Sequence, residues 1–233
     1  MHNNLFEKYQ VQVNDVQLEQ FSKYRELILE YNKVMDITNI TEYEEMYIKH
    51  FIDSIYIDKT ELEIDGKSII DVGTGGGFPG IPLKFMYPTT SIALMDSLNK
   101  RIKFLQAVID TLNLDDIEAL HARAEELARD KHYREKFDIA VSRAVAELRT
   151  LTEYCLGFVR VGGYFIAMKG PNFQEELDNS LNAIKELGGN VEKTITYSLP
   201  DESGERSIIL IKKIKPTPSK YPRGQGKPRS KPL

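Results

Sequence analysis

The sequence predicts an α/β fold built on a mostly parallel seven-stranded sheet with an antiparallel last strand. From Ser68 onward, short β-prone runs alternate with helical patterns, which is typical of parallel strands connected by helices. Near the end of the chain, two further apolar runs are separated only by residues 200–204. This linker is too short for a crossover helix, so we expect these two strands to pair antiparallel.

The chain divides into three parts. Residues 16–31 and 43–57 place apolar side chains at helical spacing, so we expect residues 1–65 to form a helical N-terminal extension. Residues 66–214 hold the alternating strands and helices of the main domain. Residues 215–233 form a basic tail whose prolines and glycines disfavour helix and strand, so we expect this tail to be extended and mobile without a partner.

The main domain contains β-prone runs and apolar helical faces in a regular order. One strand is expected to begin after a turn at Gly162-Gly163, and a late helix is expected to end near Leu187, before Gly188-Gly189. Residues 102–112 present one apolar helical face. The expected strands lie at residues 68–72, 91–95, 137–141, 164–168, 191–197 and 206–211, with one more before His121.

The composition is that of an ordinary globular protein, with 41% apolar and 28% charged residues among 233. No apolar run is long enough to span a membrane, and the first residues lack the basic and apolar segments of a secretory signal. Cys155 is the only cysteine, which excludes an intramolecular disulfide and a cysteine-based zinc site. We expect a cytoplasmic monomer that binds neither a membrane nor a metal.

Charge is distributed unevenly along the chain. The formal net charge is −4, yet residues 212–233 contain eight Lys and Arg side chains and no Asp or Glu. The rest of the chain therefore carries 23 basic against 35 acidic residues. A basic terminal segment is typical of contact with a polyanion, but a solubilising, disordered end explains the same composition. The tail alone does not decide between them.

A glycine-rich loop follows the first strand at residues 71–80. Glycines at Gly73, Gly75 and Gly77 let the backbone come into contact with a bound nucleotide, which any Cβ would block. The register differs from the dinucleotide fingerprint, because Phe78 stands where the third glycine should be. The spacing instead resembles the first motif of Rossmann-like, class I methyltransferases.

Two further segments at the same sheet edge suit a nucleoside. Asp96 ends the second strand about twenty residues after the loop, where a carboxylate can accept both hydroxyl protons of a ribose. NAD and S-adenosylmethionine would use it equally, and a helix cap is compatible with that role. After the third strand, Ala124 and Glu125 lie where an adenine would sit, although Glu125 also suits the first turn of a helix.

The segment after the fourth strand indicates the acceptor chemistry. It begins Ser142-Arg143-Ala144 and lacks the Asn/Asp-Pro-Pro-aromatic segment of enzymes that methylate exocyclic amines. Carbon methylation usually needs a thiolate, and Cys155 lies in an apolar helical pattern typical of a core residue. An acceptor that is already nucleophilic remains, such as a ring nitrogen or an oxygen. Guanine N7 fits without a general base, so we expect catalysis by positioning and electrostatics, with Arg143 as the candidate side chain.

The motifs together resemble one family along nearly the whole chain. They are the loop at residues 71–82, Ser142-Arg143-Ala144, Met168-Lys169-Gly170, the closing pattern from Tyr221 to Leu233, and the upstream segments at residues 39–41 and 50–54. This combination is similar to the GidB/RsmG family, bacterial 16S ribosomal RNA guanine-N7 methyltransferases. The family often has Ala or Pro at position 76, where this chain has Gly, and this difference should only loosen the loop.

The resemblance implies an S-adenosylmethionine-dependent enzyme whose partner is small-subunit ribosomal RNA or the ribosomal particle. It implies cofactor contacts at Gly73, Phe78, Ala124, Glu125 and Arg143, beside the glycines and Asp96 that spacing suggests. It also gives the tail a role, since Lys and Arg suit phosphates and Tyr suits base stacking. The candidate RNA-binding residues are Lys169, Arg206, Tyr221, Arg223, Lys227 and Arg229.

His50 and Asp53 lie one helical turn apart, a spacing that suits a metal site or an acid–base pair. No third ligand is visible in the sequence near them. A buried, hydrogen-bonded pair that ties the extension to the main domain is therefore favoured.

Three other functions share part of this pattern. A small-molecule methyltransferase would keep every cofactor feature but would have no use for the basic tail. A NAD-dependent oxidoreductase is disfavoured by the register of the glycine loop. A non-enzymatic RNA chaperone with the same fold would differ by binding no cofactor.

Overall fold

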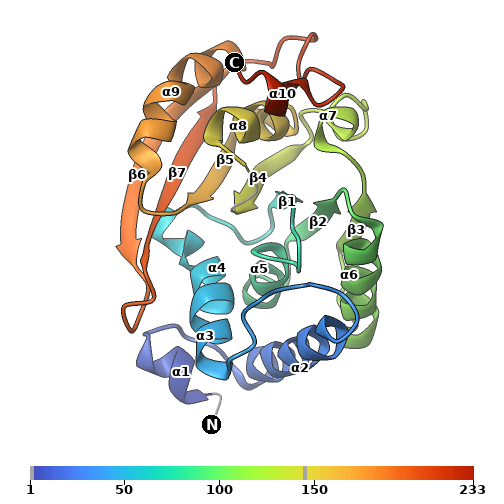
Figure 1. Cartoon of the computed structure of the whole chain (residues 1–233), viewed down its shortest axis with the longest axis vertical. Helices are drawn as coiled ribbons and strands as arrows, with labels where there is room; N and C mark the ends of the chain where they lie inside the picture. Colours follow the sequence, from blue (N-terminus) through green and yellow to red (C-terminus); the bar gives the residue numbers. More distant parts are fainter. Residues whose placement is uncertain (1–2, 144–145) are drawn as a thin grey trace.

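The computed structural model describes residues 3–143 and 146–233, and it confirms the α/β architecture (Figure 1). Within these residues, one seven-stranded sheet has the order β3-β2-β1-β4-β5-β7-β6. Neighbouring strands are parallel except where β7 pairs antiparallel with β5 and β6. The strands are β1 (Ser68–Val72), β2 (Ser91–Asp96), β3 (Ile117–His121), β4 (Phe137–Arg143), β5 (Val159–Lys169), β6 (Gly189–Ser198) and β7 (Glu205–Lys213).

Helices cover both faces of the sheet, so the molecule has three layers (Figure 1). The N-terminal part includes a π-helix, η1, and a 3₁₀-helix, η2, in the run of helical turns that follows α2. The helical elements are α1 (Asn3–Lys8), α2 (Asp15–Asn32), α3 (Tyr43–Met46), η1 (Tyr47–Ile52), α4 (Asp53–Ile55), η2 (Tyr56–Thr60), α5 (Gly80–Met86), α6 (Asn99–Leu112), α7 (Ala124–Leu127), α8 (Leu148–Leu156), α9 (Phe173–Glu186) and α10 (Lys227–Ser230).

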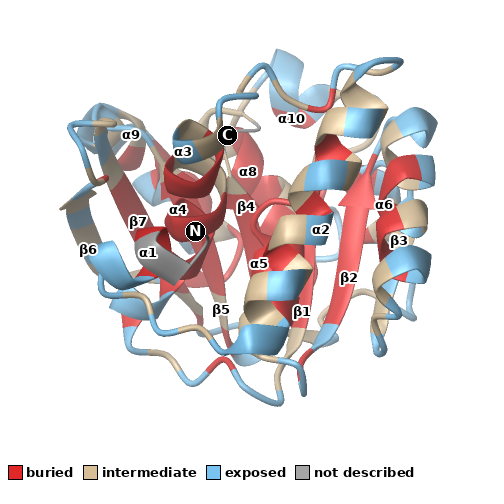
Figure 2. Ribbon diagram, turned by 90° about the horizontal axis from the view of Figure 1, so that it is seen from below, coloured by how far each residue is buried: buried red, intermediate tan, exposed pale blue. Residues whose placement is uncertain are grey.

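Alternate residues of each central strand contribute to two separate apolar layers. Successive side chains of a strand point to opposite faces, so a continuous apolar run fills both layers. On one face, Ile69 of β1 packs in the same cluster as apolar residues of α2, α5 and α6. On the other, Ile70 and Val72 pack with residues of α8, α9 and the C-terminal part. Figure 2 shows the buried strands between these helices.

The N-terminal helices complete the first of these layers. Phe21 of α2 packs edge-on against Phe85 of α5, with ring centroids 5.0 Å apart. Tyr24 of α2 lies 5.6 Å from the ring of Phe78, which belongs to the glycine-rich loop. The described part of the extension, residues 3–65, therefore shares one core with the main domain, and the loop rests directly on it.

Strand β5 begins earlier than its sequence suggests. A turn is expected at Gly162-Gly163, but β5 runs without a break from Val159 to Lys169. Its pairing with β4 shifts register between Phe137 and Ile139, beside these glycines. A Cβ at Gly163 would lie 2.4 Å from the carbonyl oxygen of Asp138. The glycine therefore permits close backbone contact within a strand and does not end it.

The C-terminal segment (residues 215–233) is not extended, and the expectation of a mobile tail is wrong for this structure. It folds back over the face that carries α7 and α8 and ends in the short helix α10 (Figure 1). Tyr221 is only 4% exposed and belongs to the second apolar cluster. Arg134 donates to the carbonyl oxygens of Thr217 at 2.7 Å and Tyr221 at 2.8 Å. These contacts add to the backbone hydrogen bonds within the segment, such as that from the N–H of Tyr221 to the carbonyl oxygen of Pro218.

The strongest anchor of this segment is an ion pair with α8. The guanidinium of Arg223 donates to Glu153 through two nitrogens, with the closest contact at 2.7 Å. The backbone N–H of Arg223 donates to the same carboxylate at 2.6 Å. The Glu153 side chain is 1% exposed, so its charge is stabilised almost entirely by residues that come from the tail.

Replacing Arg223 with Ala should therefore destabilise the fold. The substitution leaves the Glu153 carboxylate buried without its cation, which costs about 3 kcal/mol of unfolding free energy. Urea denaturation followed by circular dichroism measures this change. Lys220→Ala serves as the control, because Lys220 pairs with Glu186 at the surface and its loss should leave the midpoint nearly unchanged. Equal midpoints for Arg223→Ala and the unmodified chain would contradict the assignment.

Candidate functional site

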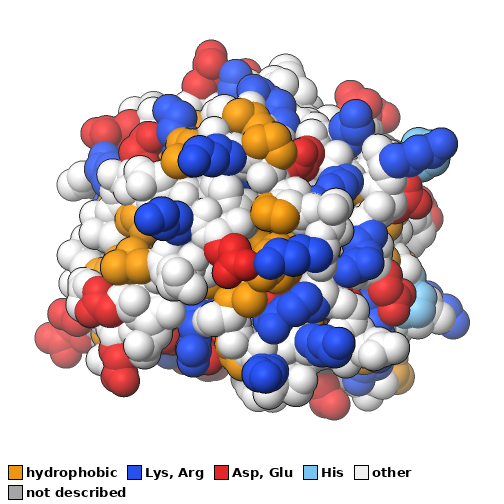
Figure 3. Space-filling model, turned by 90° about the horizontal axis from the view of Figure 1, so that it is seen from above, with side chains coloured by type: hydrophobic (Ala, Val, Ile, Leu, Met, Phe, Trp, Pro, Cys, Tyr) orange, Lys and Arg blue, Asp and Glu red, His pale blue; other side chains and the backbone are white. Residues whose placement is uncertain are grey.

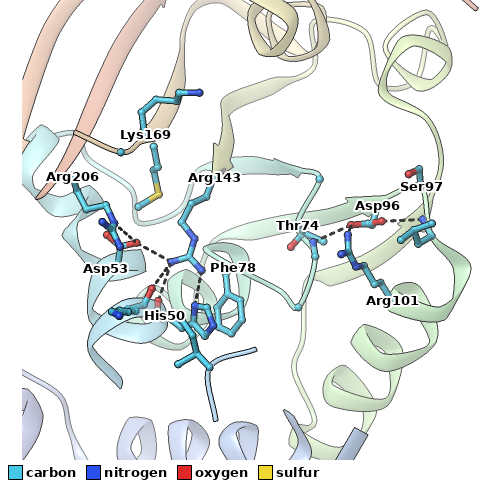
Figure 4. A pocket seen from close by; sticks show the side chains of 18 of the residues that line it. His50, Asp53, Thr74, Phe78, Asp96, Ser97, Arg101, Arg143, Lys169 and Arg206 are labelled. Carbon is cyan, nitrogen blue, oxygen red and sulfur yellow. Dashed lines mark hydrogen bonds and ion pairs between the residues drawn. The ribbon is translucent and has the colours of Figure 1, made fainter. Parts of the chain in front are cut away.

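Two adjoining cavities lie at the carboxyl ends of the parallel strands, where open α/β sheets bind ligands. The large cavity has a volume of about 720 Å³ and includes Arg143, Phe78 and the first half of the glycine loop (Figure 4). The small cavity has a volume of about 340 Å³ and includes the start of α7. Gly73, Asp96 and Ser97 line both. The two cavities therefore meet at the loop and at the end of β2.

Hydrogen bonds within the loop fix its shape. The buried carboxylate of Asp71 accepts from the hydroxyl of Thr74 at 2.7 Å and from the N–H of Gly80 at 2.9 Å. The N–H groups of Gly73 and Thr74 both donate to the carbonyl oxygen of Met95 on β2. Burial raises the pKa of Asp71 to about 6, although these two hydrogen bonds oppose the rise. One end of the loop is thus tied to β2 and the other to its own first residue.

The glycines of the loop serve two different purposes. Gly73 and Gly75 have φ angles of +75° and +62°, and a Cβ at Gly75 would meet nothing within 4 Å. Both line the large cavity, so their backbone is open to a ligand. Gly77 was expected to contact the cofactor but lines neither cavity; its Cβ would lie 2.6 Å from Ile81 and 2.7 Å from the hydroxyl of Tyr24. Gly77 therefore allows the loop to pack on the core.

Asp96 supports the loop as well as facing the cavities. Its Oδ2 accepts from the N–H of Gly75 at 3.0 Å and from Arg101 at 3.2 Å, and its Oδ1 accepts from the N–H of Leu98 at 2.9 Å. A carboxylate oxygen accepts about two hydrogen bonds, so only Oδ1 retains capacity. The ribose contact of Asp96 stays a prediction, and Oδ1 is the oxygen with capacity for it.

The small cavity contains the other expected nucleoside contacts. Ala124 and Glu125, at the start of α7, line it together with Asp96. Tyr154 of α8 and three residues of the C-terminal segment complete its wall. The cavity is therefore closed partly by a segment that sequence reasoning assigned to RNA.

Arg143 is bound by the N-terminal helices and is not an ordinary surface cation. It stands at the end of β4, its side chain is 13% exposed, and its Nη1 donates to Asp53 at 3.0 Å and to the carbonyl oxygen of Lys49 at 3.2 Å. Lys49 lies in the π-helix η1, a rare widened turn that is frequent at functional sites. The guanidinium also lies over the ring of Phe78, 5.1 Å from its centroid. Figure 4 shows Arg143 pointing toward these groups.

His50 and Asp53 tie the extension to the main domain, and both contact Arg143. His50 Nδ1 lies 3.3 Å from Arg143 Nη2, and its Nε2 lies 2.7 Å from the hydroxyl of Thr38. Its ring stacks on Phe78 with centroids 4.4 Å apart. Burial, together with the nearby charge of Arg143, lowers the pKa of His50 to about 3. The ring is therefore neutral and held on both edges.

Two of the candidate RNA-binding residues also line the large cavity. Lys169, at the end of β5, donates to the carbonyl oxygen of Ala146 at 2.9 Å and pairs with Glu176 at 2.6 Å. Arg206 Nε lies 3.8 Å from Asp53 Oδ2. Both therefore have anionic or carbonyl partners, yet each remains at the cavity wall.

The tail residues separate into three groups. The ring of Tyr221 is buried against the body, so stacking on a base is incompatible with this structure. Arg223 is occupied by Glu153 and lines neither cavity, so its expected phosphate contact is replaced by a structural one. Lys227 is exposed, whereas Arg229 is exposed and also lines the small cavity.

Sequence reasoning missed several residues of the large cavity. Tyr197 donates its hydroxyl to Asp53 at 2.9 Å, and Lys49 and Arg101 bring two further cations. Arg101 could have been found, since it lies in the first turn of the helix that follows Asp96. Nothing in the sequence indicated Tyr197, because its strand, β6, comes near the site only as a result of the strand order in the sheet.

The described residues provide neither a cluster for a metal ion nor a helix that could span a membrane. Within the described part of the chain, no group of three or more His, Cys, Asp or Glu residues could hold a metal ion. Among the same residues, no helix combines the length and apolarity needed to cross a membrane.

Known proteins with the same fold bind a methyl donor or are named for its use. Fibrillarin from Aeropyrum pernix, in complex with S-adenosyl-L-methionine, superposes with a TM-score of 0.54 at 14% identity, over 69% of this chain and 73% of that one. A SAM-dependent methyltransferase from Aquifex aeolicus superposes with a TM-score of 0.53 at 16% identity, over 71% and 92%. These likenesses confirm the Rossmann-like methyltransferase fold.

Sequence comparison identifies the family. The ribosomal RNA small subunit methyltransferase G of Lachnoclostridium phytofermentans is 52% identical over 221 residues, which are 95% of this chain and 91% of that protein. The protein of the same name from Acetivibrio thermocellus is 50% identical over 223 residues, 96% of this chain and 91% of that protein. The family model for GidB, rRNA small subunit methyltransferase G, matches residues 17–206. The chain therefore belongs to the GidB family of small-subunit ribosomal RNA methyltransferases.

Proposed function

We propose that this chain transfers the methyl group of S-adenosylmethionine to N7 of a guanine in 16S ribosomal RNA. The observation that supports this most is the junction of two cavities at Gly73 and Asp96. The small cavity has the walls of a nucleoside site, and the large cavity has a strongly basic lining. A cofactor placed across the junction would present its reactive end to an acceptor in the large cavity.

The residues at the junction fit this cofactor. The open backbone at Gly73 and Gly75 can approach the ligand closely, and Asp96 Oδ1 can accept one ribose hydroxyl. Ala124 and Glu125 then lie beside the adenine. When bound, the cofactor supplies a methyl group on a positively charged sulfur. Phe78 and Arg143, which the resemblance places among the cofactor contacts, line the large cavity together with Gly73 and Gly75.

The groups of the large cavity suit an acceptor that needs no general base. Both nitrogens of His50 are engaged and its low pKa keeps it neutral. Asp53 is held by Arg143 and Tyr197, and Asp96 by the loop and Arg101. These groups are engaged in holding their neighbours in position. Guanine N7 has a free lone pair and no proton to lose, so positioning and electrostatics suffice.

The charge of the site favours RNA over a small molecule as acceptor. The lining of the large cavity includes five cations and two carboxylates, namely Lys49, Arg101, Arg143, Lys169 and Arg206 with Asp53 and Asp96. Lys and Arg side chains also gather on the end of the molecule that carries the C-terminal segment (Figure 3). The exposed ones in that segment include Lys215 and Lys227. Such a surface suits a phosphate backbone. We further infer a monomer that acts in the cytoplasm, since both faces of the sheet are covered within one chain and ribosomal RNA is its substrate.

The direct test of this function is chemical mapping of ribosomal RNA. Reduction and aniline cleavage break the RNA at N7-methylguanine. One guanine of 16S ribosomal RNA should be cleaved in cells that contain the protein and spared in a deletion strain, and the purified protein with S-adenosylmethionine should restore cleavage. An unchanged cleavage pattern in the deletion strain, with methyl transfer to a small molecule instead, would show that the acceptor is wrongly assigned.

The role of Asp96 predicts a loss of cofactor affinity. Asp96→Ala removes one ribose hydrogen bond and the support of the Gly75 N–H, so binding should weaken by roughly 1 to 3 kcal/mol. Isothermal titration calorimetry with S-adenosylhomocysteine measures this change. Asp110→Ala is a suitable control, because Asp110 is an exposed acid far along α6. Unchanged affinity for Asp96→Ala, or tighter binding of NAD by the unmodified chain, would refute the assignment.

The exposed lysines of the C-terminal segment predict salt-dependent RNA binding. Replacing Lys215 and Lys227 together with Ala should weaken binding of 16S ribosomal RNA and reduce the slope of log affinity against log salt by roughly 1 to 2. Filter binding between low and moderate salt measures the slope. A matched pair, Lys23→Ala with Lys33→Ala, removes equal charge from α2 and its C-cap and should leave the slope unchanged. Identical slopes for both pairs would place the RNA surface elsewhere.

A further inference from the structure

One wall of the small cavity comes from the end of the chain. Gly226, Arg229 and Ser230 line it, although they lie outside the sheet and its connecting helices. We propose that the C-terminal segment is part of the cofactor site: Gly226, Arg229 and Ser230 contact the adenosine, and docking of the segment sets cofactor affinity. This inference rests on the proposed function, because it takes the small cavity as the adenosine site.

Helix α8 connects the anchors of the segment to the cavity. Tyr154 of α8 lines the small cavity, and its neighbour Glu153 holds Arg223. One turn earlier, the hydroxyl of Thr150 donates to the carbonyl oxygen of Pro228 at 3.0 Å. Pro228 lies directly before Arg229, so this hydrogen bond fixes the backbone at the cavity wall. The same helix face therefore positions both the ligand wall and the segment that covers it.

The region after α7 provides a second attachment. Arg129 donates through Nε to the carbonyl oxygen of Pro222 at 2.8 Å, and Arg134 donates to that of Tyr221 at 2.8 Å. Arg129 lies one turn beyond Glu125, which lines the cavity. The segment is thus attached both to α8 and to the residues that follow α7.

The chemistry of Arg229 suits the face of an adenine. A guanidinium is planar and weakly hydrated, and it stacks on aromatic rings as well as pairing with anions. The charges of Glu125 and Arg229 act in opposite directions on the pKa of Tyr154, which burial raises. Glu125, Tyr154 and Arg229 all line the small cavity. Arg229, expected from sequence to bind RNA, is assigned here to the cofactor.

Thermodynamic linkage follows from this arrangement. If the docked segment contributes contacts to the cofactor, then the bound cofactor must stabilise the docked segment by the same free energy. Two measurements therefore test one coupling from opposite sides: the effect of the segment on affinity, and the effect of the ligand on the segment.

The first measurement is calorimetric titration of the full chain with S-adenosylhomocysteine. Arg229→Ala should weaken binding by roughly five- to tenfold, since it removes one wall contact. Lys231→Ala removes the same charge two positions further along the chain, from a side chain that does not line the cavity. The affinity of this variant should stay within about twofold of the unmodified value. Circular dichroism of both variants confirms that they are folded.

The second measurement is limited trypsin digestion of the unmodified chain. Saturating S-adenosylhomocysteine should slow cleavage after Arg223 and Arg229 several-fold, and NAD at the same concentration should not. Equal affinity for Arg229→Ala and the unmodified chain, or cleavage rates that the ligand does not change, would overturn the inference while Asp96→Ala still reports on the cofactor site. A lack of S-adenosylhomocysteine binding by the unmodified chain would overturn the proposed function itself, and this inference with it.

Discussion

The ion pair between Arg143 and Asp53 is the interaction on which the site depends. It joins the end of β4 to the N-terminal helices at 3.0 Å, with side chains only 13% and 3% exposed. Removing one partner of such a pair typically costs about 3 to 5 kcal/mol, because the other charge stays buried. Phe78 and His50 stack beside it, so the loop, the extension and the strand end are positioned together. The extension is therefore a structural part of the large cavity.

The fold and the glycine loop were predictable because their signals are local. An apolar run such as residues 68–72 fixes a buried strand by itself, and β1 has these bounds in the structure. The loop needs glycine at Gly73 and Gly75 whatever lies elsewhere, since their φ angles are positive. Gly77 shows the limit of that reasoning. Its positive φ could be expected, but the hydroxyl of Tyr24, 2.7 Å from its missing Cβ, comes from a distant helix.

The C-terminal segment was mispredicted because its partners are remote in sequence. Composition indicates that prolines disfavour regular structure, although the short helix α10 does form. It does not show that Arg134 donates to Thr217, 83 residues away. Glu153, within an apolar helical pattern, was the one available signal. A buried acid on a helix needs a cation, and the pattern cannot tell that this cation is Arg223. Segments without periodicity take their structure from such contacts.

The charge of the tail illustrates the same point quantitatively. Counted by composition, residues 212–233 carry eight cations for RNA. Lys213 is fully buried and donates to the carbonyl oxygen of Leu156, and burial lowers its pKa to about 8. Arg223 neutralises Glu153, and Lys220 pairs with Glu186. The number of cations available to a polyanion is therefore smaller than the eight that composition gives. The paired cations of the segment are not available to a polyanion. Instead they attach the segment to the body of the protein, where it closes the small cavity.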